Sequence, residues 1–278
     1  MHGDAVHVGQ DVGGREFVIT ADDVARYRAG TDTPSAGETP APALLYHSEV
    51  YRDLSWYLPN LIGNLHARQE WAVFAPFAVG EPVRSRVTVV ERYRKRDREY
   101  VVAEVLFTTP AGRWLQRSRT HQSFLADLAG DQLVVDRNRE RRDDRRFTVP
   151  SSGLEDIPLQ TRTITHAMCQ AFSGPVPNYH TDQAMARALG FPDIVVQGMM
   201  SVAFVAETLA ARFGDGWQRG GALDVRLVNV VWPNDQLTVH GMVREIVPEG
   251  SAQRAHLDVW CAKADGTITV IGTASAVI

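Results

Sequence analysis

The feature that most constrains the fold is an internal repeat. Two segments, VGEPVRSRVTVVERY and WPNDQLTVHGMVREIV, each open with a turn signal and continue as alternating apolar residues, the pattern of a half-buried strand. Three pairs of turn or strand-end markers are each separated by 154 positions: Gly80 and Asn234, Glu91 and Glu245, Gly112 and Gly266. A constant offset across three markers indicates two copies of one structural unit.

Upstream of these segments the offset between the copies changes. FVITADDVARY, ending at Tyr27, resembles TRTITHAMCQAF, ending at Phe172, and Thr20 then matches Thr165 at an offset of 145. The first copy is therefore nine residues shorter, 154 minus 145, between these markers. The deficit falls where the second copy carries the stretch NYHTDQA. We expect that loop in one copy only.

The length of 278 residues accommodates two domains with well-buried cores. We expect the first copy over residues 1–130 and the second over residues 151–278. Residues 131–150 are predicted to link them, since the stretch DRNRERRDDRRF is rich in charges of both signs, which is typical of a solvated segment. Attraction of this stretch to a nucleotide-bearing substrate is the alternative.

The pattern predicts one helix followed by several strands in each half. The run 198–213 is apolar almost all round, which favours a buried helix, and the first-half helix is expected over 47–58. Strands are expected over 83–93, 98–107 and 113–124, and then over 222–232, 235–247, 254–262 and 267–277. A buried helix wrapped by an antiparallel sheet, twice over, is an α+β architecture.

Composition narrows the classes of partner. A formal net charge of −4 gives no reason to expect nucleic acid or an anionic membrane as a partner. The longest apolar stretch is broken by Gln197 and is too short to span a bilayer. The two cysteines, Cys169 and Cys261, form no CxxC pair, so we expect no metal, no cofactor and a reduced cytoplasmic setting.

The stretch FSGPVPNYHTDQAMARALGFPDIVVQGMM resembles the signature of MaoC-like (R)-specific enoyl-CoA hydratases and dehydratases. The matching positions are Ser173, Gly174, His180, Asp182, Ala184, Gly190, Gly198 and Met199. The WPND and KADG turns also fit this family, and the first half resembles the degenerate copy of its two-copy members. The resemblance implies a double hotdog fold whose halves pack as a pseudo-dimer around a thioester tunnel. The chain is then either a homodimer or a pseudo-dimeric monomer.

The motif also departs from the family at four positions. The family's catalytic Asp is replaced by Pro175, its Asn by Pro177 and its Pro by Asn178. The histidine before the oxyanion glycine is replaced by Gln197. These departures leave the fold prediction intact and put the activity in question.

Each candidate site residue has a chemical and a structural interpretation. His180 is the predicted general acid and base, because histidine changes protonation near neutral pH; otherwise it is a histidine bonded near a helix start. Gly198 is the predicted oxyanion donor at a helix start, or else a packing glycine. Asp182 is expected to cap a helix, with orientation of His180 as the alternative. Further substrate-binding or orienting candidates are Asn178, Tyr179 and Gln197.

The predicted activity is hydration of a 2-enoyl thioester, or the reverse dehydration, on a substrate carried by coenzyme A or an acyl carrier protein. Two alternatives stay open because Pro175 stands where the family has its Asp. One is related chemistry with a single proton shuttle, namely isomerisation, elimination or cyclisation. The other is a non-catalytic hotdog protein that binds a thioester.

Overall fold

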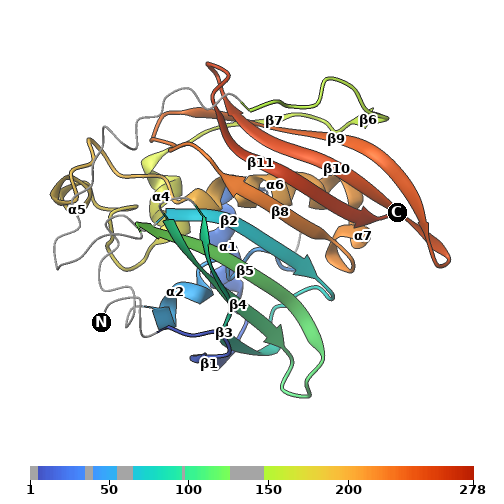
Figure 1. The fold of residues 1–278 in the computed structure, drawn as a ribbon, viewed down its shortest axis with the longest axis horizontal. Coiled ribbons are helices and arrows are strands. Elements are labelled where there is room, and N and C mark those ends of the chain that lie inside the picture. The colour runs from blue at the N-terminus through green and yellow to red at the C-terminus, as the bar shows by residue number, and fades with distance from the viewer. Residues whose placement is uncertain (1–5, 35–39, 55–64, 96–97, 126–146) are drawn as a thin grey trace.

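The computed structural model describes residues 6–34, 40–54, 65–95, 98–125 and 147–278 (Figure 1). The first half contains β1 (Asp11–Val18), α1 (Ala21–Thr31), α2 (Glu49–Leu54), β2 (Leu65–Val73), β3 (Pro82–Lys95), β4 (Arg98–Thr108) and β5 (Trp114–Leu125). The second half contains β6 (Glu155–Asp156), β7 (Gln160–Thr163), α4 (His166–Ser173), α5 (Gln183–Ala188), α6 (Gly198–Phe213), α7 (Asp215–Gln218), β8 (Ala222–Leu227), β9 (Gln236–Glu249), β10 (Ala252–Lys263) and β11 (Ile268–Val277).

The strands of both halves form one continuous antiparallel sheet. Its order is β1-β3-β4-β5-β2-β8-β11-β10-β9-β6, with β7 also paired to β9. The halves meet where β2 pairs with β8, from Arg68 opposite Arg226 to Ala72 opposite Ala222. Figure 1 shows the sheet curving around α6 in the second half, with α2 on the same side in the first. This is the α+β double hotdog architecture.

The offset of 154 recurs in the backbone geometry. The turn residues Gly80 and Asn234 have φ values of 82° and 72°, and Gly112 and Gly266 have 86° and 83°. Positive φ is easily adopted by glycine and tolerated by asparagine, which explains why these residue types mark the turns. The bulges recur as well: one lies at Val90 and Arg244, and another at Leu115 and Thr269.

The offset of 145 relates two helices that pack against each other, α1 and α4. Thr20 caps α1 by accepting a hydrogen bond from Asp23 N, and Thr165 caps α4 by accepting one from Met168 N. The helices carry Tyr27 and Phe172, whose ring centroids lie 5.8 Å apart. Each threonine therefore marks a helix start in its own half.

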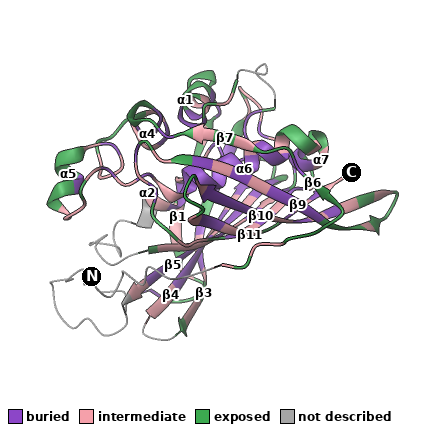
Figure 2. Ribbon diagram, turned by 90° about the horizontal axis from the view of Figure 1, so that it is seen from above, coloured by how far each residue is buried: buried purple, intermediate pink, exposed green. Residues whose placement is uncertain are grey.

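Helix α6 has the predicted bounds and is the centre of the core. Ten of its residues are buried, from Met199 to Leu209, and Figure 2 colours most of the helix as buried. Gly214 follows the helix with φ 52°, as expected of a residue that ends it. Within the described part of the chain, no helix has both the length and the apolar character needed to cross a membrane.

Several predicted bounds need correction. The first-half helix begins at Glu49 rather than at residue 47, because residues 42–48 form successive tight turns, for example one closed by the hydrogen bond from Leu45 N to Pro42 O. The predicted end of this helix, 55–58, lies outside the described residues. The strand expected over 222–232 ends at Leu227, since Val231 O leaves the sheet to accept a bond from Val196 N.

Some elements were missing from the sequence-based prediction, namely the strands β1, β2, β6 and β7 and the helices α1, α4 and α7. Strand β2 places the polar Gln69 at a buried position, in line with Trp71 and Val73, which obscures the pattern. Of the predicted linker 131–150, residues 131–146 lie outside the described residues, and 147–150 have no regular structure.

Candidate active site

The loop that carries His180 joins α4 to α5 and is held by the side chain of Asn178. Its Oδ1 accepts a hydrogen bond from His180 N at 2.8 Å, and its Nδ2 donates to Ser173 O and Val176 O, both at 2.9 Å. Asparagine can satisfy donors and acceptors of a turn together. Asn178 therefore shapes the loop rather than projecting toward a substrate.

The ring of His180 is fixed by a backbone carbonyl. Its Nδ1 lies 2.6 Å from Val195 O, and because a carbonyl only accepts, the neutral ring carries its proton on Nδ1. Burial lowers the pKa of His180 to about 4, against an opposing effect of the Val195 bond. At neutral pH the ring is uncharged, and Nε2 presents a lone pair that can accept a proton.

The neighbours of His180 have structural roles. Asp182 caps α5, because its Oδ1 accepts a hydrogen bond from Met185 N at 2.8 Å, and the bond that orients His180 comes from Val195 instead. Tyr179 packs against the core, with its ring centroid 3.9 Å from that of His180. Burial raises the pKa of the Tyr179 hydroxyl.

Gln197 ties the two halves together at the start of α6. Its Oε1 accepts from Ser173 Oγ at 2.8 Å, and its Nε2 donates to Ser48 Oγ of the first half at 2.9 Å. Because both ends of the amide are occupied, Gln197 makes no side-chain cap on α6. The N–H groups of the first turn are left available at the positive end of the helix dipole.

Gly198 is the first residue of α6 and is partly exposed, whereas Met199 and Met200 behind it are fully buried. A Cβ at position 198 would lie 2.1 Å from Leu227 Cδ2, so the packing itself favours glycine here. The geometry thus supports the packing interpretation directly. It also leaves the Gly198 N–H at an accessible helix start, as the oxyanion interpretation requires.

His47 of the first half is a site residue that the sequence analysis did not single out. Its ring stacks on Phe172, with centroids 3.9 Å apart, and its Nδ1 lies 3.3 Å from Leu44 O. Its Nε2 is buried and has no hydrogen-bond partner among the described residues. The Gln197 side chain, which bonds to Ser173 and Ser48, lies near enough to raise the pKa of the ring, against the larger lowering by burial. The offset of 154 places His47 on Ser201, in the first turn of α6, and this signal could have identified it.

His47 and His180 are both uncharged at neutral pH. Burial lowers the pKa of His47 to about 4, and the nearby His180 contributes to the lowering. Pro175, where the resembled family has its Asp, is exposed. Among the described residues no carboxylate bonds to His180 or shifts its pKa. The candidate site therefore brings together two neutral imidazoles, a glutamine and the start of a buried helix.

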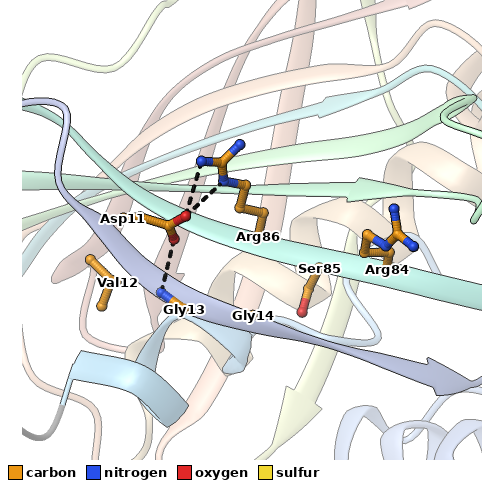
Figure 3. A pocket seen from close by; sticks show the side chains of 7 residues that line it. All are labelled: Asp11, Val12, Gly13, Gly14, Arg84, Ser85 and Arg86. Atoms are coloured by element: carbon orange, nitrogen blue, oxygen red, sulfur yellow. Dashed lines mark hydrogen bonds and ion pairs between the residues drawn. The ribbon is translucent and has the colours of Figure 1, made fainter.

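Other regions of the described chain do not contribute to this site. No group of three or more His, Cys, Asp or Glu side chains there is arranged as metal ligands would be. A surface pocket lies instead on the edge strand β1 and its neighbour β3 (Figure 3). Its lining consists of Asp11, Val12, Gly13, Gly14, Arg84, Ser85 and Arg86.

Known proteins resemble this chain in sequence over one segment and in fold over nearly its whole length. Residues 155–264 match the family model described as a MaoC like domain. The second half therefore contains a MaoC-like domain over these residues. The match covers β6 to β10 and therefore includes His180 and Gly198. No curated protein matches the sequence.

Solved structures show that the fold extends beyond the MaoC-like domain. A MaoC-like dehydratase from Phytophthora capsici has a TM-score of 0.72 at 15% identity, with 98% of each chain covered. A Mycobacterium tuberculosis protein described as having a double hotdog fold has a TM-score of 0.60 at 10% identity, covering 99% of this chain and 97% of that one. Peroxisomal multifunctional enzyme type 2 of Drosophila melanogaster has a TM-score of 0.64 at 16% identity, covering 95% of this chain and 48% of that one.

Proposed function

We propose that the protein is a lyase of the hydratase and dehydratase type that acts on an acyl thioester carried by coenzyme A or an acyl carrier protein. The observation that carries the proposal is the Nδ1 bond of His180 to Val195 O, which leaves Nε2 as a base close to the start of α6. The MaoC-like domain over 155–264 supports this class of chemistry.

The reaction needs one base and one oxyanion donor. His180 Nε2 removes a proton from water while the water oxygen bonds to C3 of a 2-enoyl thioester. The electrons of the C2=C3 bond move toward the thioester oxygen, where the Gly198 N–H and the helix dipole stabilise the enolate. Collapse of the enolate returns the proton from His180 to C2, so that one water has been added. Dehydration is the reverse sequence.

His47 is the second group that the site offers. Its Nε2 is neutral and lacks a partner among the described residues, so it can hold the water that His180 deprotonates. The His47 imidazole of the first half would thus hold the water, which is part of the role of the Asp in the resembled family. Gln197 and Asn178 orient the site through the bonds already described rather than by reacting.

A second candidate is chemistry with a single proton shuttle, namely isomerisation, elimination or cyclisation. The observation that favours it is the lack of any carboxylate bonded to His180 among the described residues. Elimination of a good leaving group or ring closure by an internal hydroxyl would need only His180. A non-catalytic thioester-binding protein is the third candidate and predicts no turnover at all.

The proposal extends to organisation and location. We keep 1–130 and 151–278 as the proposed domains, and a homodimer or a pseudo-dimeric monomer as the proposed assembly. A cytoplasmic location is proposed because Cys169 and Cys261 are both buried as free thiols, which suits a reducing compartment.

A turnover assay with crotonyl-type and hydroxyacyl-type thioesters tests the proposal. We expect kcat/KM to fall about 10²- to 10⁴-fold in His180→Ala and in His180→Gln. We expect a smaller loss in His47→Gln, because His180 remains. His7→Gln is the matched control, since His7 is exposed and far from the site in sequence. Full activity in His180→Ala would refute the role of His180, and lack of turnover by wild type on every thioester would favour the binding protein.

A further inference from the structure

The inner faces of the two halves differ in polarity at equivalent positions. In the second half these positions hold small or apolar residues, namely Leu223, Val270, Gly272, Ala274 and Ala276. In the first half the residues 154 positions earlier are buried and polar, namely Gln69, Gln116, Ser118, Thr120 and Gln122. The strand register is the same, since Gln69 lies opposite Thr120 and Leu223 opposite Ala274. Buried polar groups are costly unless they are bonded, so the polar face calls for an explanation.

Part of this polar face is satisfied internally. Gln69 Nε2 donates to Ser118 Oγ at 2.8 Å, and Gln69 Oε1 accepts from Thr120 Oγ1 at 3.0 Å. These three side chains bond to one another and need no further partner. Because these bonds occupy the Gln69 amide, it has no full hydrogen bond to offer its other neighbour, His66.

Gln116 Nε2 is one buried atom of this face that has no hydrogen-bond partner among the described residues. The other unsatisfied part is the cross-strand pair His66 and Gln122. These residues lie directly opposite each other on β2 and β5, which places their Cβ atoms about 5 Å apart. His66 Nε2 and Gln122 Oε1 are both buried and have no hydrogen-bond partner among the described residues. Leaving such atoms unpaired costs stability, so the fold retains two polar atoms that another group can satisfy.

The chemistry of the pair is complementary. The Tyr51 hydroxyl lies 3.1 Å from His66 Nδ1. When that hydroxyl donates, the neutral ring carries its proton on Nε2, which becomes a donor. Burial lowers the pKa of His66 to about 4, so the ring is neutral at pH 7. Gln122 Oε1 is an acceptor, and a single hydroxyl can therefore accept from His66 and donate to Gln122.

The pair lies close to the candidate active site. Ser48 bonds to Gln197 at the start of α6, and Tyr51, which bonds to His66, follows within the same turn, since Tyr51 N donates to Ser48 O. One helical turn rises only about 5 Å. An acyl chain whose thioester carbonyl meets Gly198 would therefore meet the first-half face beside residues 48–51.

We propose that the His66–Gln122 pair binds a hydroxyl group on the acyl chain, so that the substrate is an oxygenated acyl thioester rather than a plain fatty one. The proposal rests on the proposed function for the thioester end of the substrate. To that function it adds the chemical class of the acyl chain that the substrate carries. A purely aliphatic chain would leave both polar atoms buried and unpaired, and would be disfavoured for that reason.

Binding of saturated acyl-pantetheine thioesters tests the proposal without requiring turnover. Isothermal titration would compare plain chains, from butanoyl to decanoyl, with the same chains carrying a terminal hydroxyl. At the length that reaches the pair, we expect the hydroxylated chain to bind on the order of tenfold or more tightly than the plain chain. The double variant His66→Phe/Gln122→Leu should lose this preference, because both polar atoms are gone.

Gln116→Met is the matched control, since Gln116 lies on the inner face of the same strand, six residues away, and should keep the preference. Equal or tighter binding of the plain chains by wild type would overturn the proposal, as would a hydroxyl preference that survives in the double variant. Binding of neither series would overturn it together with the thioester assignment. A hydroxyl preference without turnover of any enoyl thioester would support the polar pair and refute the proposed reaction.

Discussion

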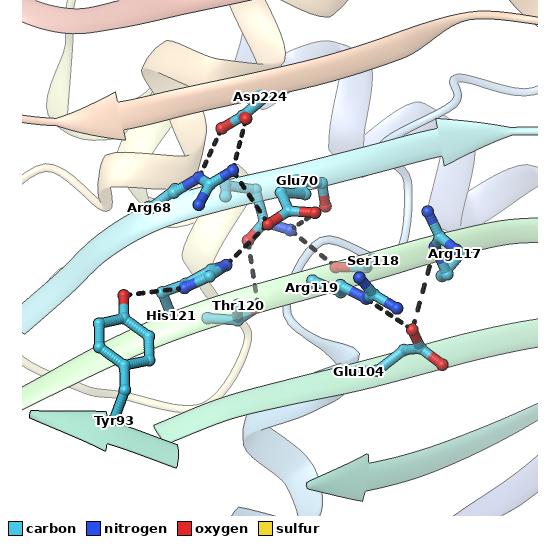
Figure 4. A network of polar contacts seen from close by, with 11 residues as sticks. Arg68, Glu70, Tyr93, Glu104, Arg117, Ser118, Arg119, Thr120, His121 and Asp224 are labelled. Atoms are coloured by element: carbon cyan, nitrogen blue, oxygen red, sulfur yellow. Dashed lines mark hydrogen bonds and ion pairs between the residues drawn. The ribbon is translucent and has the colours of Figure 1, made fainter. Parts of the chain in front are cut away.

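Glu70 lies directly opposite its own repeat mate, Asp224, where β2 pairs with β8. The two positions are 154 apart, so the axis that relates the halves passes between these two carboxylates. Arg68 bonds both, with Nη2 at 2.5 Å from Asp224 and 3.2 Å from Glu70, and His121 Nε2 lies 2.9 Å from Glu70 (Figure 4). The junction of the halves thus depends on a shared arginine between like charges.

Arg68→Met should weaken this junction. Removing the guanidinium leaves Glu70 and Asp224 facing each other, and like charges directly opposite are destabilising. We expect the free energy of unfolding in urea to fall by about 1 kcal/mol, because the groups are partly exposed. Arg226→Met is the control: Arg226 is exposed and lies opposite Arg68, so its removal should cost nothing. Equal losses in both variants would contradict this assignment.

The buried histidines should make stability depend on pH. Burial lowers the pKa of His47, His66 and His180 to about 4 each, from an ordinary 6.5. As pH falls below about 6.5 the unfolded state takes up protons first, so stability is full above that pH and declines until about pH 4. Each histidine contributes up to about 1.4 kcal/mol per pH unit in this window.

Urea unfolding at a series of pH values measures this effect. The stability of His66→Gln should be less sensitive to pH than that of the wild type between pH 6.5, the ordinary pKa of histidine, and pH 4, its lowered pKa here, because one proton uptake is removed. Parallel curves for the wild type and the variant would show that His66 is not buried in its neutral form.

Activity should tolerate mild acid. The proposed base, His180, has a pKa of about 4 because of burial, so Nε2 stays unprotonated well below neutral pH. We expect kcat/KM, measured as initial rates after a pH jump, to stay level through the weakly acidic range and to fall only as pH approaches that value. A decline centred near pH 6.5, the ordinary value of the group, would show that the His180 ring is solvated.

Gly198→Ala separates the packing role of the glycine from its chemical role. A Cβ there would lie 2.1 Å from Leu227 Cδ2, the end of a flexible side chain that can turn aside, so we expect a stability loss of about 1 kcal/mol. In a Leu227→Ala background the overlap is gone, and the alanine should cost little further stability. If Gly198 also admits a thioester carbonyl, turnover should remain depressed in the double variant relative to Leu227→Ala alone. Equal turnover would leave only the packing role.

The sequence by itself determined the features that depend on neighbours in the chain. The periodicity of 198–213 predicted α6 to the residue, and the marker turns recur at positive φ because local sterics favour glycine and asparagine there. The capping of α5 by Asp182 is likewise local, since the carboxylate bonds three residues on. The resemblance to MaoC-like proteins and the double hotdog fold were also readable from the motif and the repeat.

Only the tertiary structure decided which groups meet. His47 lies over a hundred residues from His180 in sequence, and it was found because the Ser48–Gln197 bond and the ring of Phe172 bring the halves together. The single continuous sheet and the unpaired atoms of His66 and Gln122 also arise from pairing between distant strands. Such contacts depend on burial and on the partners left over after folding, and no local pattern encodes either of these.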